Sequence, residues 1–471
     1  MSKTNKILCI GDIILDTYCK GVIERISPEA PIPVLKVLED DINILGGSGN
    51  VARNIVAAGD KCHLISIIGN DNNGKAIKSL CKKFKNLTFD LIIDKNRCTT
   101  KKNRFVSGNQ QILRVDSEKS DYISKDLTKK ILSIVYKKLN QIKIIIISDY
   151  NKGLLTKELL EKIIQVSKVK NKIVIVDPKN RDLSIYKNAD IITPNLKELF
   201  EATESNLIPN QKTIEKLSRK IIKDFGFQHV ITTKSSDGIS LVSKKLQTLH
   251  LPSKAKEVFD VSGAGDTVVS YIASGILRNY SLEESVKLAN EAAGIAVSKF
   301  GTATVSRNEV NQKLKKRFKI CSLNNLIQEL KKKKIKEIGF TNGCFDLLHT
   351  GHIDYLQKSR NKCDFLILGL NSDASTKKLK GKSRPILSEE DRSEILAQFD
   401  FIDRIVIFSD LTPLKLINKI KPNYIFKGDD YKLNEVVGAR EIRKWGGKVV
   451  LIKCKKDKST SKIIERIKNG T

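Results

Sequence analysis

Short runs of β-branched and other apolar residues, separated by stretches with helical periodicity, constrain the fold of this chain more than any other feature. The apolar runs occupy residues 7–10, 64–68, 144–147, 173–176 and 230–232. Uninterrupted runs of this length are typical of strands buried on both faces of a parallel sheet. Amphipathic stretches between them, such as residues 156–168 and 213–225, supply crossover helices. The first part of the chain therefore predicts an α/β fold with a doubly wound sheet.

Two segments of the first part alternate apolar and polar residues instead. They lie at residues 104–106 and 112–115. Because alternation is typical of half-buried antiparallel strands, these segments predict a small β lid beside the main sheet.

A second α/β pattern follows a polar, Lys-rich stretch. Strands are expected from residue 338 onward and at 365–370, 404–407, 424–427 and 449–452. This pattern predicts a small Rossmann-like sheet. We therefore expect a first domain at residues 1–317, a Lys-rich connecting helix or linker at 318–334, and a second domain at 335–471.

The composition is strongly basic, with 85 Lys and Arg against 53 Asp and Glu and a formal net charge of +32. Phosphate backbones are bound chiefly by Lys and Arg, so a basic nucleic-acid-binding protein is a rival interpretation. Lys is, however, scattered through almost every element, and the densest run, residues 331–334, has no aromatic residues interleaved for base stacking. We therefore expect no nucleic-acid partner.

Nine cysteines occur without a Cys-x-x-Cys pair, a pattern typical of reduced thiols in the cytosol. Met1-Ser2-Lys3 leads directly into a strand, without the apolar core of a signal peptide. The longest Ile run, residues 144–147, is far too short to span a membrane. The expected location is cytoplasmic, with no membrane partner.

Val261-Ser262-Gly263-Ala264-Gly265-Asp266 is the first of two phosphate-handling motifs. Its small residues let backbone N–H groups close on an anion at a helix start, where the helix dipole also favours negative charge. Asp266 then lies beside that anion. Polar residues also follow several predicted strands, at Gly11-Asp12, Ser148-Asp149-Tyr150, Asp177-Pro178-Lys179 and Thr193-Pro194-Asn195. Since parallel sheets bind ligands at the carboxyl ends of their strands, these residues predict one crevice.

The motif set resembles the ribokinase family of carbohydrate kinases: Gly46-Gly47 with Asn50, Thr193-Pro194-Asn195 with Glu198, and the segment from Asp260 to Asp266. The resemblance implies that Asp266 is the general base for the sugar hydroxyl and that the preceding small residues form the anion hole. It implies an ATP site made by Asn195, Leu196, Lys197, Glu198, Thr233, Gly238, Gly263, Ala264 and Gly265, with Glu198 as a ligand of Mg²⁺. The expected sugar-binding residues are Asp12, Asp16, Gly46, Gly47, Asn50, Arg104 and Lys179.

His349-Thr350-Gly351-His352, after the strand at 338, is the second motif, and it takes two of the five His of the chain. Imidazoles at a helix start are able to donate hydrogen bonds to phosphate oxygens. Two His at i and i+3 are also compatible with metal binding or simple capping, although no third ligand stands at a spacing suited to a closed zinc site.

This second segment is similar to the cytidylyltransferase-type nucleotidyltransferases. The resemblance implies that His349 and His352 stabilise charge on the phosphates of a nucleoside triphosphate. The implied nucleotide-binding residues are Thr341, Asn342, Gly343, Phe345, Gly351, Asn371, Asp373, Lys427, Ser459, Thr460 and Ser461.

The order of the two modules, together with residues 25–34 and Lys380-Gly381-Lys382-Ser383-Arg384-Pro385, resembles the bifunctional heptose 7-phosphate kinase and heptose 1-phosphate adenylyltransferase family of lipopolysaccharide biosynthesis. This resemblance implies ATP and Mg²⁺ as cofactors, sugar phosphates as substrates, a separate phosphatase between the two steps, and a homodimer. The spacing of His349 and His352 does not distinguish ATP from CTP. The alternative is therefore a fused kinase and cytidylyltransferase that acts on a different sugar phosphate.

Overall fold

The computed structural model describes residues 6–108, 110–253, 258–299, 301–332, 335–381 and 383–453. The chain divides into two compact units, Met1–Val310 and Asn311–Thr471. Each unit has its own sheet and its own hydrophobic core.

The main sheet of the first unit has the order β14-β13-β12-β11-β10-β9-β1-β5-β6. All five apolar runs form strands in it, so the predicted doubly wound α/β sheet is confirmed. The sequence did not predict the two antiparallel strands at one edge, β13 and β14, which make the sheet mixed. The strands are β1 (Lys6–Gly11), β5 (Lys61–Ile68), β6 (Leu87–Ile93), β9 (Ile142–Ser148), β10 (Ile173–Asp177), β11 (Ile191–Ile192), β12 (His229–Thr233), β13 (Ile239–Ser243) and β14 (Leu249–Leu251).

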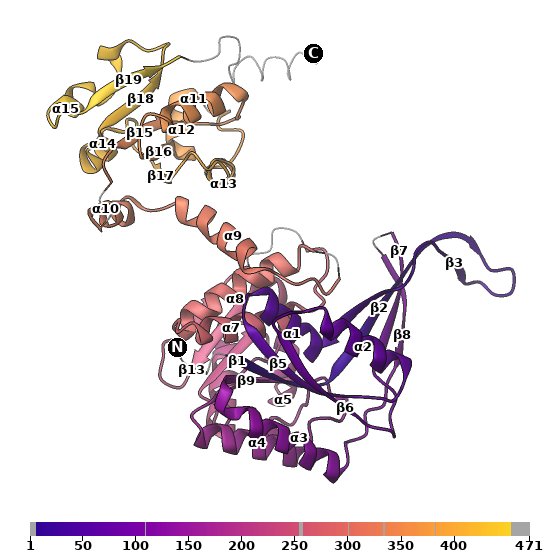
Figure 1. Cartoon of the computed structure of the whole chain (residues 1–471). Helices are drawn as coiled ribbons and strands as arrows, with labels where there is room; N and C mark the ends of the chain where they lie inside the picture. Colours follow the sequence, from indigo (N-terminus) through magenta and orange to yellow (C-terminus); the bar gives the residue numbers. More distant parts are fainter. Residues whose placement is uncertain are drawn as a thin grey trace. The chain divides into compact units, whose positions relative to one another are not determined.

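Helices cover both faces of this sheet. Figure 1 shows α1 (Ser48–Ala57), α7 (Ala264–Leu277) and α8 (Leu282–Ala296) on one side, with α3 (Lys125–Lys138) and α4 (Lys157–Val169) on the other. Ile145 and Ile147 of β9 pack in the core cluster that α3 and α4 also line. Ile144 and Ile146, which alternate with them, are equally inaccessible to solvent at 0 % exposure. Burial on both faces explains why β9 is apolar without interruption. The remaining helices are α2 (Asn72–Lys82), α5 (Leu196–Ala202) and α6 (Gln211–Phe225).

A second, five-stranded sheet forms the lid. Its order is β3-β2-β7-β8, with β4 paired to β2. The predicted antiparallel pair is present as β7 (Lys101–Ser107) and β8 (Gln110–Ser117). The other three lid strands, which the sequence did not predict, are β2 (Ile13–Ile26), β3 (Pro33–Val37) and β4 (Ile42–Gly47).

The second unit contains a parallel sheet of order β17-β16-β15-β18-β19, as expected for a Rossmann-like fold. Each predicted strand is present: β15 (Ile338–Gly343), β16 (Phe365–Asn371), β17 (Arg404–Phe408), β18 (Tyr424–Gly428) and β19 (Lys448–Ile452). The helices of this part are α10 (Leu323–Lys332), α11 (Thr350–Arg360), α12 (Asp373–Lys380), α13 (Glu389–Ala397), α14 (Leu414–Ile420) and α15 (Ala439–Arg443).

The described part of the Lys-rich stretch between the two motif sets contains two helices. Helix α9 spans Arg307–Lys319, and α10 follows it. Leu326 of α10 is fully buried in a core cluster that includes Phe340 and Ile425 of the second unit. Among the described residues, no helix combines the length and apolar character needed to cross a membrane.

Candidate active sites

Asp266 lies in the first turn of α7, at the N-terminal end of the helix. Gly263 caps this helix with φ of +78°, a left-handed conformation that glycine adopts without strain. The carboxylate is 3 % exposed, and burial raises its pKa to about 6. A buried carboxylate with a pKa close to neutrality has the properties of a general base.

Two donors from distant segments hold the Asp266 carboxylate. Asn50 Nδ2 of α1 donates to Oδ2 at 2.7 Å, and the Tyr150 hydroxyl, from the loop after β9, donates to Oδ1 at 2.7 Å. Arg53 Nη1 lies 3.3 Å from Asn50 Oδ1 and so orients the amide. These contacts bring the Gly46-Gly47…Asn50 segment and the Asp266 motif together, as the family resemblance implies.

Two expected sugar-binding residues of the lid, Asp16 and Arg104, form an ion pair whose acidic member interacts electrostatically with this carboxylate. Asp16 of β2 accepts from Arg104 Nη1 of β7 at 2.6 Å. A side chain at Gly46 would overlap the Asp16 carboxylate, so glycine permits this close approach. The charge of Asp16 also raises the pKa of Asp266. Asp16, Gly46, Asn50, Arg104 and Asp266 therefore form one polar cluster.

Three other expected sugar-binding residues have different surroundings. The Asp12 carboxylate accepts backbone N–H groups of Tyr150, Lys152 and Leu154 at 3.1 to 3.3 Å, so it fixes the loop after β9. Gly47, with φ of +57°, precedes the first residue of α1. The Lys179 ammonium forms an ion pair with Glu198 at 2.9 Å and belongs to the expected ATP residues by position. Their roles in sugar binding stay predictions.

The Asn195 and Glu198 pair forms a capping box at the start of α5. Asn195 Oδ1 accepts the Glu198 N–H at 2.9 Å, and Glu198 Oε2 accepts the Asn195 N–H at 2.9 Å. Asn195 also bridges to Thr233 at the end of β12. The motif therefore aligns the ends of β11 and β12 at the positions expected for ATP contacts.

The other expected ATP residues surround the same strand ends. Lys197 is largely exposed and lies 3.7 Å from Glu201, and Leu196 is half-buried in the first turn of α5. Gly238 adopts φ of +86° in the turn between β12 and β13. A side chain at Gly265 would meet nothing within 4 Å, so the start of α7 is open to a ligand.

Asp177, at the end of β10, interacts electrostatically with both Asp266 and Glu198. Its half-buried carboxylate accepts from Thr193 Oγ1 at 3.2 Å. Burial, followed by the charges of Asp266 and Glu198, holds its pKa well above the usual range. A divalent cation with phosphate and water ligands would relieve this repulsion, and magnesium sites often use only one or two carboxylates. No group of three or more His, Cys, Asp or Glu suited to a metal occurs among the described residues.

In the second unit, the two His residues meet at the start of α11. His349 is the N-cap residue, and its ring stacks on that of His352 with centroids 3.9 Å apart. The Phe345 ring packs against that of His352 at a centroid distance of 5.2 Å. Burial lowers the pKa of His352 to about 4, so this imidazole is neutral near pH 7. A neutral imidazole still donates one hydrogen bond.

The loop between β15 and α11 has the compact form expected of a phosphate site. Phe345 adopts φ of +46°, and a side chain at Gly343 would press on its ring. Gly351 is buried in the first turn of α11. The Thr341 hydroxyl, expected to bind nucleotide, already has a partner, because it hydrogen-bonds to the Tyr355 hydroxyl at 2.7 Å.

Lys427 of β18 lies beside the same loop. Its ammonium donates to the Asn342 carbonyl at 3.1 Å and lies 5.4 Å from the Tyr431 ring centroid. Burial lowers the pKa of Lys427 to about 8. The structure thus brings Asn342 and Lys427 together. Ser459, Thr460 and Ser461, also expected to bind nucleotide, lie outside the described residues.

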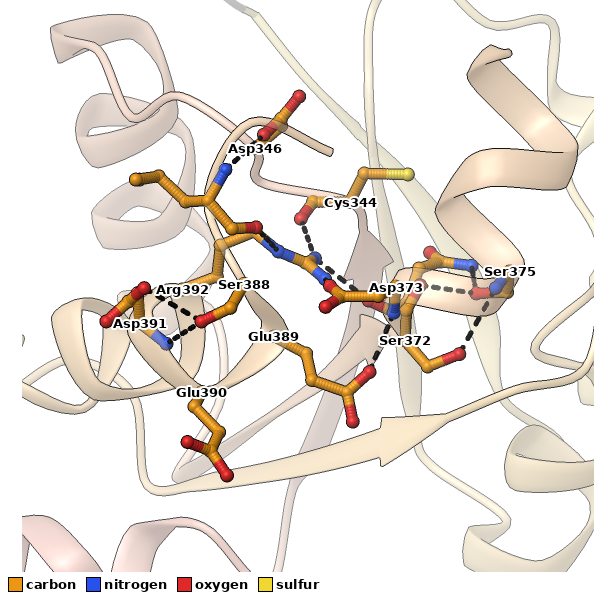
Figure 2. Close-up of polar contacts among 12 residues, drawn as sticks. Cys344, Asp346, Ser372, Asp373, Ser375, Ser388, Glu389, Glu390, Asp391 and Arg392 are labelled. Carbon is orange, nitrogen blue, oxygen red and sulfur yellow. Dashed lines mark hydrogen bonds and ion pairs between the residues drawn. The ribbon is translucent and has the colours of Figure 1, made fainter. Parts of the chain in front are cut away.

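Arg392 of α13 connects the remaining expected residues. Figure 2 shows its guanidinium between Cys344 and Asp373. It donates to the carbonyls of Cys344 and Asn371 at 2.5 and 2.8 Å and to the Asp373 carboxylate at 2.7 Å. Asn371 itself donates to Ser375 at 3.2 Å. At 1 % exposure, Arg392 thereby ties the ends of β15 and β16 together.

Sequence reasoning did not assign roles to several residues that organise the two sites. Tyr150, Asp149 and Asp177 stood in the strand-end segments that it noted, so their positions were indicated without a function. No sequence signal marked Arg392 or Asp346. Asp346 is 1 % exposed and accepts from Arg384 and from the N–H of Ile386, which fixes the segment leading to α13.

Comparison with known proteins also divides the chain into two parts, close to the two units of the structure. Residues 4–309 match the model of the pfkB family of carbohydrate kinases, and residues 340–466 match the cytidylyltransferase-like family. Full-length relatives carry both parts. The bifunctional protein HldE of Paramagnetospirillum magneticum is 40% identical over 98% of this chain and 96% of its own length. The chain belongs to the HldE family. Its member from Helicobacter pylori strain J99 is 42% identical over 98% of both chains.

Solved structures support the fold of the kinase part. Phosphofructokinase-2 from Escherichia coli, in complex with substrates and products, has a TM-score of 0.56 and 21% identity, covering 66% of this chain and 97% of its own. Arabidopsis thaliana ribokinase complexed with ribose and ATP has a TM-score of 0.51 and 18% identity, covering 66% of this chain and 99% of its own. With its HldE relatives, the protein is a carbohydrate kinase fused to a nucleotidyltransferase, and it uses ATP.

Proposed function

We propose that the protein catalyses two steps of ADP-heptose synthesis for the lipopolysaccharide inner core. The first unit phosphorylates D-glycero-β-D-manno-heptose 7-phosphate at O1 with ATP. The second transfers AMP from ATP to heptose 1-phosphate and releases pyrophosphate. The observation that carries the proposal is the full-length match to bifunctional HldE proteins, combined with a buried Asp266 that is held by two donors.

In the kinase step, the anomeric oxygen forms a bond to the γ-phosphorus while the bond to ADP breaks. Asp266 accepts the proton of the hydroxyl, since its carboxylate retains free lone pairs beside the Asn50 and Tyr150 hydrogen bonds. Backbone N–H groups of Gly263 to Gly265 and the dipole of α7 stabilise the transferred phosphoryl group. Arg104 and Asp16 contact the sugar from the lid.

Mg²⁺ is the metal we assign to the ATP phosphates. Glu198, together with the half-buried carboxylate of Asp177, would hold it directly or through water. When bound, the ion neutralises phosphate charge during transfer. Lys179 lies against Glu198 and adds a second cation at this position.

In the adenylyl step, a phosphate oxygen of heptose 1-phosphate attacks the α-phosphorus of ATP, and pyrophosphate leaves. His349 and His352 donate hydrogen bonds to the phosphate oxygens at the start of α11. Lys427, at the neighbouring strand end, supplies positive charge to the same region. These groups stabilise charge that grows in the transition state, and no covalent intermediate is needed.

The two steps require an additional enzyme between them. The kinase product is a 1,7-bisphosphate, whereas the second step uses a 1-phosphate, so a separate phosphatase removes the 7-phosphate.

We expect the protein to act in the cytoplasm as a homodimer formed through the kinase part. Exposed apolar side chains of the lid, Ile32 at 57 %, Leu38 at 60 % and Leu113 at 54 %, support a self-association surface there.

The experiment is an incubation of the whole protein with ATP, Mg²⁺ and defined sugar phosphates. We expect ADP release with heptose 7-phosphate, and pyrophosphate release only when a phosphatase is added or heptose 1-phosphate is supplied. ATP and CTP are compared in the second reaction. Preference for CTP, or for another sugar phosphate in the first reaction, would replace the proposal by the alternative kinase and cytidylyltransferase.

A further inference from the structure

Tyr150 contacts the carboxylate of Asp266, although its sequence position suggests only a strand-end turn. Its hydroxyl donates to Oδ1 at 2.7 Å, opposite the Asn50 amide on Oδ2. The two donors come from the loop after β9 and from α1, so the carboxylate plane is fixed from two independent elements. Neither donor approaches the lone pairs that a third partner needs.

The loop that carries Tyr150 is held rigidly. Asp12, buried at the end of β1, accepts the N–H groups of Tyr150, Lys152 and Leu154. Asp149 accepts the Asn151 N–H at 2.6 Å and the Tyr186 hydroxyl. The backbone on both sides of Tyr150 is therefore held in place, and from it the phenol reaches Asp266.

We propose that Tyr150 is a positioning residue of the kinase site, whose hydroxyl aligns the Asp266 carboxylate for the acceptor hydroxyl and stabilises its ionised form. The inference rests on the proposed function of Asp266 as the base. Tyr150 stands outside the sequence motifs of the kinase site.

The hydrogen bond from Tyr150 is one of the few interactions that lower the pKa of Asp266. Burial is the largest cause of the raised pKa of Asp266, and the charge of Asp16 from β2 adds to it. The negative charge of Asp266 also raises the pKa values of Asp177 on β10 and of the Cys9 thiol on β1. Against these, the Asn50 and Tyr150 hydrogen bonds and the charge of Arg53 lower the pKa. Loss of the Tyr150 donor therefore raises it further.

The test is Tyr150→Phe in the full chain, which removes one oxygen and keeps the ring. The kinase reaction requires ionised Asp266, so kcat/KM falls as the pH decreases through the pKa of the free enzyme. In the variant we expect this acid limb to move upward by about one pH unit, the size expected for one hydrogen bond to a charged group. We also expect kcat at the plateau to fall on the order of 10-fold, because the base is less well aligned.

Two further variants separate this role from a structural one. Tyr271→Phe is the matched control, since its buried hydroxyl donates to the Val305 carbonyl at 2.9 Å and does not touch Asp266. Its acid limb should stay where it is in the wild type. Replacement of Tyr150 by 3-fluorotyrosine retains the hydroxyl and makes it a stronger donor, so the limb should move downward. If Tyr150→Phe is poorly folded, the 3-fluorotyrosine protein alone decides the question.

A measurement without substrate distinguishes failure of this inference from failure of the proposed function. Carboxyl ¹³C NMR of Asp-labelled protein, with Asp266→Asn to assign the resonance, follows the titration of Asp266 directly. An upward shift in Tyr150→Phe supports the inference even if no sugar phosphate is turned over, in which case the proposed substrate is wrong. An unmoved Asp266 titration in both Tyr150 proteins would overturn it.

Discussion

The rings of His349 and His352 stack at a centroid distance of 3.9 Å, one turn of helix apart at the start of α11. The buried Nδ1 of His352 has no hydrogen-bond partner among the described residues. A buried polar atom left in this state costs free energy unless a ligand satisfies it. His352 therefore has a ring nitrogen that a ligand at the start of α11 could satisfy.

Replacement of His352 by Ala should reduce nucleotidyl transfer and spare the kinase. Removing one preorganised donor to a phosphate that gains charge typically lowers kcat about 10²–10³-fold. Pyrophosphate release from ATP and heptose 1-phosphate measures the effect. Lys358→Ala, on the exposed side of the same helix, should leave the rate unchanged. A normal rate in the His352 variant would remove this residue from the mechanism.

Asp266→Asn should abolish most of the kinase activity and leave adenylyl transfer intact. The change keeps the size of the side chain but removes the proton acceptor, and general-base assistance is commonly worth about 10²–10⁴-fold. ADP release and ATP affinity should be measured together, because only turnover is expected to fall. The exposed Asp224 provides a matched Asp→Asn control. Kinase turnover within threefold of the wild type would mean that the Asp266 carboxylate only holds Asn50 and Tyr150 in place.

The adenylyl step should lose activity at alkaline pH through Lys427. Burial lowers the pKa of this ammonium to about 8, so the cation is present below pH 8 and is lost as the pH rises above it. In Lys427→Arg the charge persists, since a guanidinium does not titrate in this range. We expect the alkaline limb of kcat/KM to disappear in this variant. An identical limb in both proteins would assign the titration to another group.

Arg392→Met should destabilise the second unit. The side chain keeps its apolar length but leaves the Cys344 and Asn371 carbonyls and the Asp373 carboxylate without their donor. Breaking a buried charged network costs on the order of 3 kcal/mol. Chemical denaturation followed by Trp445 fluorescence reports this unit, because Trp445 is the single Trp of the chain. The kinase rate should not change, and a transition unaltered in midpoint would show that water replaces these contacts.

The two units should fold separately. A fragment of residues 1–317 retains the buried Val310 and the Lys299 to Glu309 ion pair at 2.6 Å. A fragment of residues 311–471 retains the bridge between Ile320 and Ile405. We expect each fragment to be monodisperse and to carry one activity. Aggregation of both, with a well-folded intact chain, would show that the units depend on each other.

The sequence predicted the elements whose environment is uniform along their length. An Ile run such as residues 144–147 forms a strand wherever it lies inside a sheet, because both faces must be buried. The lid strand β2 was not predicted from the sequence, because Ile13–Ile26 mixes apolar, acidic and basic residues. Its extended form depends on pairing with β3, β4 and β7, which lie elsewhere in the sequence.

The site residues likewise fall into those that local sequence indicates and those that only tertiary contacts reveal. Asp266, His349 and His352 stand in local motifs, so their types and spacing indicated chemistry directly. Tyr150 and Arg392 act through partners from other segments, and only tertiary structure brings those partners together. In a short helix such as α13, which has no distinct apolar face, a buried Arg has the same local pattern as an exposed one. No rule based on local periodicity separates the two.

The hydrogen bonds on Asp266 join positions far apart in the chain, 216 residues for Asn50 and 116 residues for Tyr150. Closing such long loops costs entropy that only the completed core repays. While the chain is being synthesised, Asn50 and Tyr150 leave the ribosome long before the carboxylate they will hold. A nascent or truncated kinase unit therefore has no aligned base, and phosphoryl transfer begins only once the whole unit has folded.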